Sequence, residues 1–202
     1  MNIQFDPLIY KEKLKEFNSS EKYWKEVHLL DKLLNIGDSE IILDFGCGIG
    51  TVMDFFITRY NASVLGFDVY DYTNGLKDKV FTDLDTLTSS GSSFNKIYFF
   101  HSFAHIKQIA DVLSKLKLIL SKDSELVIIT PNLDFDNFFK SKIKESTYRP
   151  DTTVVEHYNC EKLHNLMALN GFQTVNIGQF GKFLPGEPFN ERIFGIFKVI
   201  EK

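Results

Sequence analysis

The 202-residue sequence predicts an α/β fold in which helices cover a seven-stranded, mostly parallel sheet. Two observations support this prediction. Short apolar runs alternate with helical patterns, which is typical of a parallel sheet with helices on its faces. The last two apolar runs have no helical pattern between them, so we expect them to pair as an antiparallel C-terminal hairpin. The length suits one domain, and we expect residues 1–202 to form a single domain.

The beginning of the chain predicts two helices, over residues 7–17 and 20–35. The apolar positions of the second helix recur at helical spacing, at Tyr23, Val27, Leu30 and Leu34. Residues 18–20 offer side-chain oxygens that can cap its start, and Gly37 can end it. We expect residues 1–36 to form an N-terminal helical cap on a core that spans residues 37–202.

Strand patterns recur through the rest of the chain. The predicted strands cover residues 41–43, 63–67, 79–82, 96–100, 125–130, 172–178 and 192–200. Helices are expected between some of them, from residue 52 to about 60, from 109 to 120 and from 160 to 170. The segment from residue 132 to 158 has the least regular pattern.

Composition and charge narrow the classes of function. The formal net charge is -4, whereas a protein that grips long nucleic acid usually carries a basic face, so we do not expect a nucleic-acid partner. The sequence shows neither an apolar run long enough to cross a membrane nor the apolar stretch of a signal peptide. Cys47 and Cys160 show no metal or disulfide spacing. These features indicate a cytoplasmic protein with no membrane partner and no metal.

A glycine-rich turn follows the first predicted strand and precedes a helix. Residues 44–50 read Asp-Phe-Gly-Cys-Gly-Ile-Gly, and such glycines let a ligand approach main-chain atoms closely. Ligands of open α/β sheets lie outside the carboxyl ends of the strands, where this turn lies. A dinucleotide site would read Gly-x-Gly-x-x-Gly, whereas Gly46, Gly48 and Gly50 are evenly spaced behind Asp44. The pattern therefore favours a ligand that bears an amino-acid end in place of a pyrophosphate.

Two further carboxylates follow the next two predicted strands. Asp68 ends the second strand, where it can accept hydrogen bonds from both hydroxyls of a ribose, with a helix N-cap as the alternative role. Asp83 follows the third strand and can accept from an adenine amino group, a role that Asp85 could equally take. Val69 and Leu84 are placed to cover the faces of the ring.

These motifs together resemble a class I, Rossmann-like methyltransferase that uses S-adenosylmethionine (SAM). Four segments carry the resemblance, at residues 42–50, 65–68, 95–106 and 126–132, and the last is similar to the small-molecule branch of quinone-biosynthesis type. The resemblance implies SAM as cofactor, S-adenosylhomocysteine (SAH) as product, and a set of cofactor-binding residues: Asp44, Gly46, Cys47, Gly48, Gly50, Asp68, Val69, Asp83, Leu84 and His101. Asn95 stands where many relatives have Asp and Ala104 where many have Glu or His, which leaves the acceptor chemistry open.

Three histidines are candidates for catalysis. His101 and His105 follow the fourth predicted strand, near the sulfonium end of the expected cofactor, and His157 is expected across the pocket. An imidazole can act as general base near neutral pH for an acceptor hydroxyl or amine. The alternative for the first two is capping or packing at the start of the next helix. A zinc site is not indicated, because no third ligand has a recognisable spacing.

The acceptor is expected to enter between residues 1–36, an insertion at residues 133–158 and the loop at residues 182–191. Several groups could line this pocket or be ordinary loop and helix residues: Glu156, His157 and Tyr158; Phe135, Phe138 and Phe139; and Phe183, Pro185, Phe189 and Glu191. We interpret Cys47 as a small buried residue of the glycine turn and not as a nucleophile.

The expected reaction is transfer of a methyl group from SAM to the oxygen or nitrogen of a small-molecule acceptor, mainly through in-line positioning. One alternative is an RNA or protein methyltransferase; acidic charge and a missing Asn/Asp-Pro-Pro-Tyr/Phe motif argue against a nucleic-acid acceptor. Another is a non-catalytic SAM-binding partner or sensor, which would tolerate loss of the three histidines. The glycine spacing disfavours a Rossmann oxidoreductase. No pattern indicates an oligomeric state.

Overall fold

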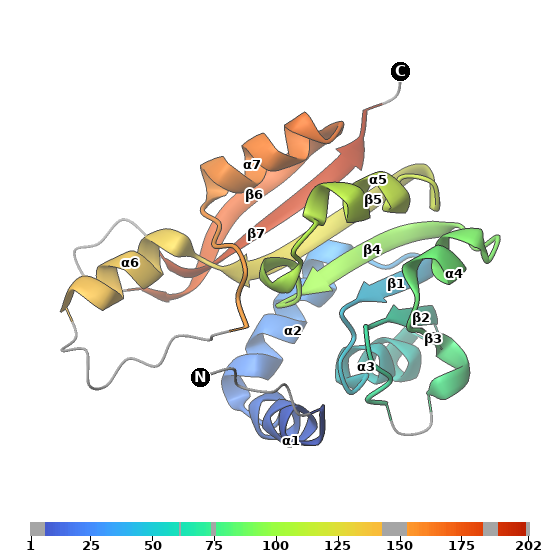
Figure 1. The fold of residues 1–202 in the computed structure, drawn as a ribbon, viewed down its shortest axis with the longest axis horizontal. Helices are drawn as coiled ribbons and strands as arrows, with labels where there is room; N and C mark the ends of the chain where they lie inside the picture. Colours follow the sequence, from blue (N-terminus) through green and yellow to red (C-terminus); the bar gives the residue numbers. More distant parts are fainter. Residues whose placement is uncertain (1–6, 61, 74–75, 143–152, 184–189, 201–202) are drawn as a thin grey trace.

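A computed structural model describes residues 7–60, 62–73, 76–142, 153–183 and 190–200 (Figure 1). Its centre is one seven-stranded sheet with the strand order β3-β2-β1-β4-β5-β7-β6. The strands are β1 (Ile41–Phe45), β2 (Ser63–Phe67), β3 (Val80–Phe81), β4 (Phe94–Phe100), β5 (Leu120–Pro131), β6 (Phe172–Phe183) and β7 (Asn190–Val199).

Strand pairing makes the sheet mixed. In the sheet order β3-β2-β1-β4-β5, each strand pairs in parallel with its neighbour. Strand β7 pairs antiparallel with both β5 and β6. The seven strands, the parallel part and the antiparallel C-terminal pair that the sequence predicts are thereby confirmed. Parallel pairing also brings the carboxyl ends of β1, β2 and β4 to one edge of the sheet, beside the glycine turn.

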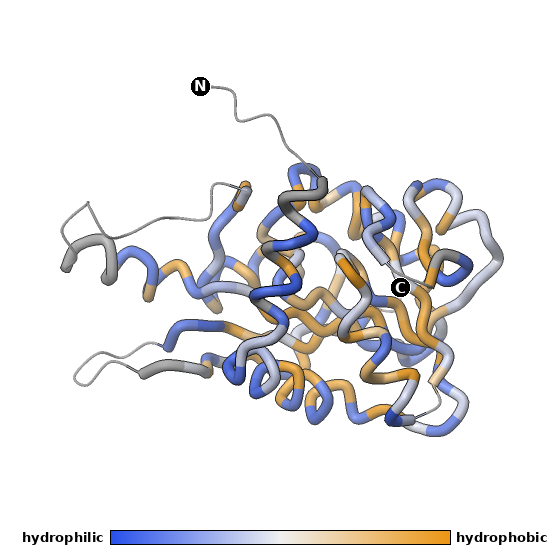
Figure 2. Tube along the Cα trace, turned by 90° about the horizontal axis from the view of Figure 1, so that it is seen from below, coloured by the Kyte–Doolittle hydropathy of each residue, from blue (hydrophilic) through white to orange (hydrophobic). Residues whose placement is uncertain are grey.

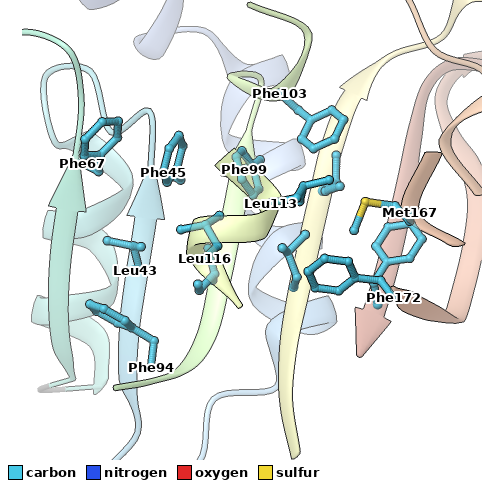
Figure 3. Close-up of a cluster of buried hydrophobic side chains, with 14 of the residues drawn as sticks. Leu43, Phe45, Phe67, Phe94, Phe99, Phe103, Leu113, Leu116, Met167 and Phe172 are labelled. Carbon is cyan, nitrogen blue, oxygen red and sulfur yellow. The ribbon is translucent and has the colours of Figure 1, made fainter. Parts of the chain in front are cut away.

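Helices cover both faces of the sheet (Figure 1). On one face lie α2 (Glu21–Leu34) and α3 (Thr51–Tyr60). On the other lie α4 (Leu84–Ser89), α5 (Ile109–Leu116) and α7 (Cys160–Leu169), and Figure 3 shows how aromatic side chains such as Phe45 and Phe99 pack there. Two further helices are α1 (Pro7–Asn18) and α6 (Leu133–Lys142).

Alternation along the strands explains why both layers form. Successive side chains of a strand point to opposite faces, so Ile42 belongs to the core under α2 and α3, whereas Leu43 belongs to the core under α5 and α7. Strands buried on both faces read as continuous apolar runs, as residues 41–43 of β1 and 97–100 of β4 do. In Figure 2 the apolar segments accordingly gather in the interior of the trace.

Helix α2 is part of this layered core. Val27, Leu30 and Leu34 are fully buried against the sheet, and the Ser20 side chain caps the helix by accepting a 3.1 Å hydrogen bond from the backbone N–H of Tyr23. The capping oxygen and the apolar face follow the sequence pattern. The helix ends at Leu34, and its C-cap is Asn35, which takes a left-handed conformation, so the stop comes before Gly37.

Several boundaries differ from the sequence-based expectation. Helix α5 ends at Leu116, because Leu120 already pairs with Phe94 as the first residue of β5. The short helix α4 was not predicted, α6 corresponds to the helix left open as one alternative for the segment around Phe135, and β6 continues to Phe183. In the part of the chain that the structure describes, no helix has both the length and the apolar character needed to cross a membrane.

Candidate functional site

The glycine turn between β1 and α3 requires glycine at three positions. Gly46, Gly48 and Gly50 have φ angles of +85°, +54° and +81°, a region that other residues rarely adopt. At Gly46 an added Cβ would lie 2.2 Å from the Cβ of Ser102, so the turn also needs the space. The backbone N–H groups of Gly46 and Cys47 both donate to the Phe67 carbonyl, at 2.7 and 3.0 Å, which fixes the turn against the end of β2.

Asp44 lies at the end of β1 with only 3% of its surface exposed. Burial, together with the negative charge of Asp68, raises the pKa of Asp44 to about 7, although the neighbouring Tyr98 hydroxyl opposes this shift. Tyr23 of α2 hydrogen-bonds to Thr51. It lies close enough to Asp44 for the negative charge of that carboxylate to raise the pKa of Tyr23. A buried carboxylate is costly unless a cation pairs with it, so this position suits a positively charged ligand group.

Asp68 lies at the end of β2, across the glycine turn from Asp44. Its Oδ2 atom accepts a 2.9 Å hydrogen bond from the backbone N–H of Gly48, which ties the carboxylate to the turn. Burial raises the pKa of Asp68, and the N–H groups of Gly48, Tyr70 and Val69 partly offset this rise. Its bond to the turn distinguishes Asp68 from the helix cap that was the alternative for this residue.

The residues expected at an adenine ring lie farther along the same edge. Asp83 is the N-cap of α4, where its Oδ1 atom accepts from the N–H and the hydroxyl of Thr86 at 2.7 and 2.8 Å. Asp85, the alternative to Asp83, instead forms an ion pair with Lys115. Val69 is 67% exposed beside Asp68, and Leu84 packs at the margin of the core.

His101 directly follows β4 and has an unusual backbone conformation. Its φ angle is +60°, which costs a residue with a side chain roughly 1–2 kcal/mol, and its N–H donates to the Ile129 carbonyl at 2.9 Å. The imidazole lies beside the Phe100 ring, with 4.4 Å between the ring centroids. Burial lowers the pKa of His101, so the ring is neutral at neutral pH. The role of His101 near the acceptor stays a prediction.

A charged cluster around His101 was not predicted from the sequence. Glu26 of α2 lies with Oε2 2.5 Å from Nε2 of His101, and Arg192 of β7 has its Nε 3.5 Å from Oε1 of Glu26. Glu191 links the cluster to Lys22, at 2.5 Å between Oε1 and Nζ. The sequence held one signal for this cluster, because Glu26 is a charged residue within the apolar face of α2.

The other two candidate histidines lie in separate surroundings. Nδ1 of His105 lies 3.0 Å from the Thr153 hydroxyl, in a one-turn 3₁₀ helix at Phe103–His105. Nδ1 of His157 lies 3.4 Å from Oδ2 of Asp136 on α6, and its side chain is 33% exposed. His101 faces Glu26, so each of the three histidines has a different partner. Their joint action in catalysis therefore stays a prediction.

The side chains of residues 156–158 lie in three different environments. Tyr158 is buried in the core under α5 and α7, whereas Glu156 forms an ion pair with Lys162. A hollow of about 550 Å³ opens beside that pair, between the start of α5 and α7, and its lining contains none of the predicted cofactor residues. His157, the third member of the group, faces α6.

Part of the predicted aromatic lining can be placed. Phe135 is buried on α6, which makes it a core-facing residue of a helix, one of the two roles considered for it. The side chains of Phe138, Phe139 and Phe183, and the residues Pro185 and Phe189, lie outside the described part of the structure.

Helix α1 lies directly over the glycine turn. Leu14 comes so close that a Cβ added to Gly48 would be 3.1 Å from its Cδ1 atom, and Asn18 donates a 2.8 Å hydrogen bond to the Thr51 hydroxyl. Cys47 is buried beneath the turn, and burial raises the pKa of its thiol, which agrees with a packing role. The described residues contain no group of three or more side chains able to hold a metal ion.

Comparison with known proteins identifies a matching family model and several solved structures with a similar fold. A family model described as a methyltransferase domain matches residues 12–177 of the chain. No curated protein matches the chain in sequence. A solved SAM-dependent methyltransferase from Aquifex aeolicus has a TM-score of 0.67 at 14% identity, and the match covers 98% of this chain and 100% of that one.

Two further solved structures are similar in fold. The first is the complex between the Haloferax volcanii Trm112 methyltransferase activator and the putative methyltransferase, with a TM-score of 0.71 at 9% identity over 99% of this chain and 100% of that one. The second is the small RNA methyltransferase HEN1, with a TM-score of 0.65 at 17% identity over 88% of this chain. The match spans 25% of the HEN1 chain, so this protein corresponds to one part of it.

Proposed function

Because this chain belongs to the methyltransferase domain family and is a SAM-dependent methyltransferase, we propose that it methylates a hydroxyl or amine of a small-molecule acceptor. SAM supplies a methyl group that already sits on a good leaving group, so the protein has mainly to hold and orient the two reactants. The quinone-biosynthesis-type branch stays part of this proposal, on the sequence resemblance alone.

One observation carries the cofactor assignment: Asp44, the glycine turn and Asp68 converge at one edge of the sheet. Gly48 donates to Asp68 at 2.9 Å, and Asp44 is buried behind the turn. We assign the methionine end to Asp44 and the turn, and the ribose to Asp68 in place of its present bond to Gly48. The adenine is assigned to Val69 and Leu84 with Asp83, whose side chain is exposed at the start of α4.

The surroundings of His101 support a small acceptor. The side chains of Glu26, His101 and Arg192 are only 5%, 17% and 13% exposed, so the carboxyl ends of β4 and β5 face an enclosed polar cluster. A nucleic acid would need an accessible basic surface, whereas the cations of this cluster are matched by Glu26 and Glu191. The net charge of -4 agrees with this assignment.

Calorimetry with SAM and SAH tests the cofactor site. We expect micromolar binding to the wild type and at least about tenfold weaker binding to Asp68→Ala, because charge-assisted hydrogen bonds to the ribose are lost. Asp54→Ala serves as control, since Asp54 is an exposed acid on α3, and it should bind like the wild type. Equal binding by Asp68→Ala and the wild type would refute the ribose assignment.

The acceptor class is tested with SAM that carries a trideuterated methyl group. The protein is incubated with three fractions of a cell extract, namely small molecules, RNA and proteins, and each is analysed by mass spectrometry. We expect the label in the small-molecule fraction. Label in RNA or protein would contradict the proposed acceptor, and SAM binding without transfer to any fraction would favour the non-catalytic sensor.

A further inference from the structure

The groove between α5 and α7 lies on the sheet face opposite to α2 and α3 (Figure 1). It contains the hollow of about 550 Å³, whose apolar lining consists of Ile106, Ile109, Val155, Tyr158, Leu166 and Leu169. The lining includes none of the predicted cofactor residues, so the groove is separate from the site at the carboxyl ends of β1 and β2. What binds there is therefore independent of the proposed function.

Helices α5 and α7 form the two walls of the groove and run in the same direction. Lys107, just before α5, and Glu161, in the first turn of α7, both line the hollow at the starts of the helices. At the other end, Nζ of Lys117 donates a 2.9 Å hydrogen bond to the carbonyl oxygen of Asn170. These two residues are the C-caps of the helices, so start lies beside start and end beside end.

Large apolar side chains are exposed where the groove ends. Leu169 is the last residue of α7 and Leu118 follows the C-cap of α5, and their exposed fractions are 87% and 77%. Each is next in the chain to one of the two residues that join the helix ends, so both walls carry an exposed leucine there. An apolar hollow that such side chains extend is typical of a surface that another protein covers.

The two walls also carry opposite charges at the start of the groove. Lys107 and Glu161 are exposed, and neither has an ion-pair partner among the residues that the structure describes. Glu156 lines the hollow as well, but it already pairs with Lys162. The α5 wall thus offers one cation and the α7 wall one anion, and a surface with this arrangement is complementary to a second copy of itself.

We infer that this surface binds a second copy of the chain about a twofold axis that runs along the groove. Such an axis sets α5 of each chain against α7 of the other and keeps the starts of the helices together. One rotation then brings Lys107 opposite Glu161 of the second copy. The same rotation brings Leu118 opposite Leu169 of the second copy, and each of the two contacts occurs twice.

Charge and apolar contact have different tasks in this dimer. The four leucines and the apolar hollows lose contact with water, which supplies most of the affinity. Exposed ion pairs add little affinity, but they favour one docking direction over the others. An axis across the groove would set the start of one groove against the end of the other, and Lys107 would then face no anion of the groove.

Sedimentation equilibrium of the full-length protein tests the inference. We expect the wild type to be a dimer at micromolar concentration. Leu169→Glu should weaken the dimer at least about tenfold, because it places a charge in an apolar contact. Its far-UV circular dichroism should equal that of the wild type, since Leu169 is exposed at the end of α7 and holds no other element.

A charge exchange tests the direction of the axis. Lys107→Glu and Glu161→Lys should each weaken the dimer about three- to tenfold, because each creates two pairs of like charges. The double variant exchanges the charges of both walls and should return to within about twofold of the wild type. Lys32→Glu is the matched control, because Lys32 is an exposed lysine of α2 on the other face of the sheet, and it should leave the dimer unchanged.

Three outcomes would overturn the inference. A wild type that stays monomeric up to about 0.1 mM would show that the groove does not bind a second copy and would leave it to a partner of different sequence. A dimer that Leu169→Glu does not weaken would use another surface. A double variant that is no stronger as a dimer than the two single variants would refute the contact between Lys107 and Glu161.

Discussion

At the scale of single residues, Asp44 is a buried group whose ionisation affects the ligand-free protein. Its pKa of about 7 lies well above the ordinary value of 3.8, because burial and Asp68 disfavour the charge. The folded chain therefore holds this proton more tightly than the unfolded chain does. The stability that results is fully present below the unfolded pKa and is lost as the pH rises through 7.

Replacement of Asp44 by Asn should remove this loss. Between pH 6 and pH 8 the wild type should lose roughly 1 kcal/mol of unfolding free energy at this group, whereas Asp44→Asn should not. Urea unfolding at the two pH values, without ligand, measures the difference. Asp54→Asn, at an exposed acid of α3, should follow the wild type. A difference between Asp44→Asn and the wild type that is the same at both pH values would contradict the argument.

SAM binding should show the opposite pH dependence. The positively charged amino-acid end of SAM favours ionised Asp44, so the affinity should rise from pH 6 and level off above 7, by at most about tenfold per pH unit. Calorimetry at fixed ionic strength measures it. Asp44→Asn should bind more weakly and lose most of the dependence, and a wild-type affinity that falls as the pH rises would speak against Asp44 as the partner of the ligand.

The sequence could reveal some of these residues and not others, for a physical reason. Asp44 and Gly46 stand in one continuous turn, so local spacing was enough to find them. Glu26 contacts both His101 and Arg192, and residues so far apart in sequence are brought together by the packing of α2 and β7. A charged residue on an apolar helix face was the one local sign of this contact.

At the scale of elements, the packing of α3 against β2 controls the position of the glycine turn. Gly66 in β2 is buried, and an added Cβ would lie 2.6 Å from Sδ of Met53 and 2.9 Å from Sγ of Cys47. Gly66→Ala should therefore cost about 1–3 kcal/mol of unfolding free energy through overpacking and should weaken SAM binding by displacing Cys47.

Thermal unfolding and calorimetry of Gly66→Ala measure these two effects. Gly37→Ala is a suitable control, because the atom nearest to its added Cβ is 3.7 Å away and its backbone does not require glycine. That variant should stay within about 0.5 kcal/mol of the wild type. Equal stability of the two variants would mean that α3 moves freely against β2.

Element boundaries show where local patterns stop being informative. Leu113, Leu116 and Leu120 share one helical spacing, yet Leu120 starts β5 because pairing with Phe94 of β4 satisfies its backbone there. Helix α4 is only six residues long and depends on the Asp83 cap, so its sequence has too little periodicity to be recognised. Tertiary contacts decide both cases, whereas long apolar strands such as β4 are evident from sequence alone.

At the scale of the whole molecule, the two core layers share the sheet between them. Ile42 and Leu43 are neighbours in β1 but pack under different helices, so neither layer can lose its packing without exposing the sheet to water. Helix α2 belongs to one of these layers through Leu30 and Leu34, although the sequence suggested a cap at residues 1–36. This arrangement predicts that α2 unfolds together with the sheet.

Trp24 allows this to be measured, because it is the single tryptophan of the chain and lies on α2, 5.9 Å from the Phe55 ring. Its fluorescence and the far-UV circular dichroism of the whole chain should give the same urea midpoint. Leu30→Ala should lower both midpoints together, because loss of the buried side chain costs about 2–5 kcal/mol of unfolding free energy. SAM at a hundredfold excess over its Kd should add about 2.7 kcal/mol to the unfolding free energy of the wild type. A fluorescence transition that precedes the dichroism would show instead that α2 detaches as a separate cap.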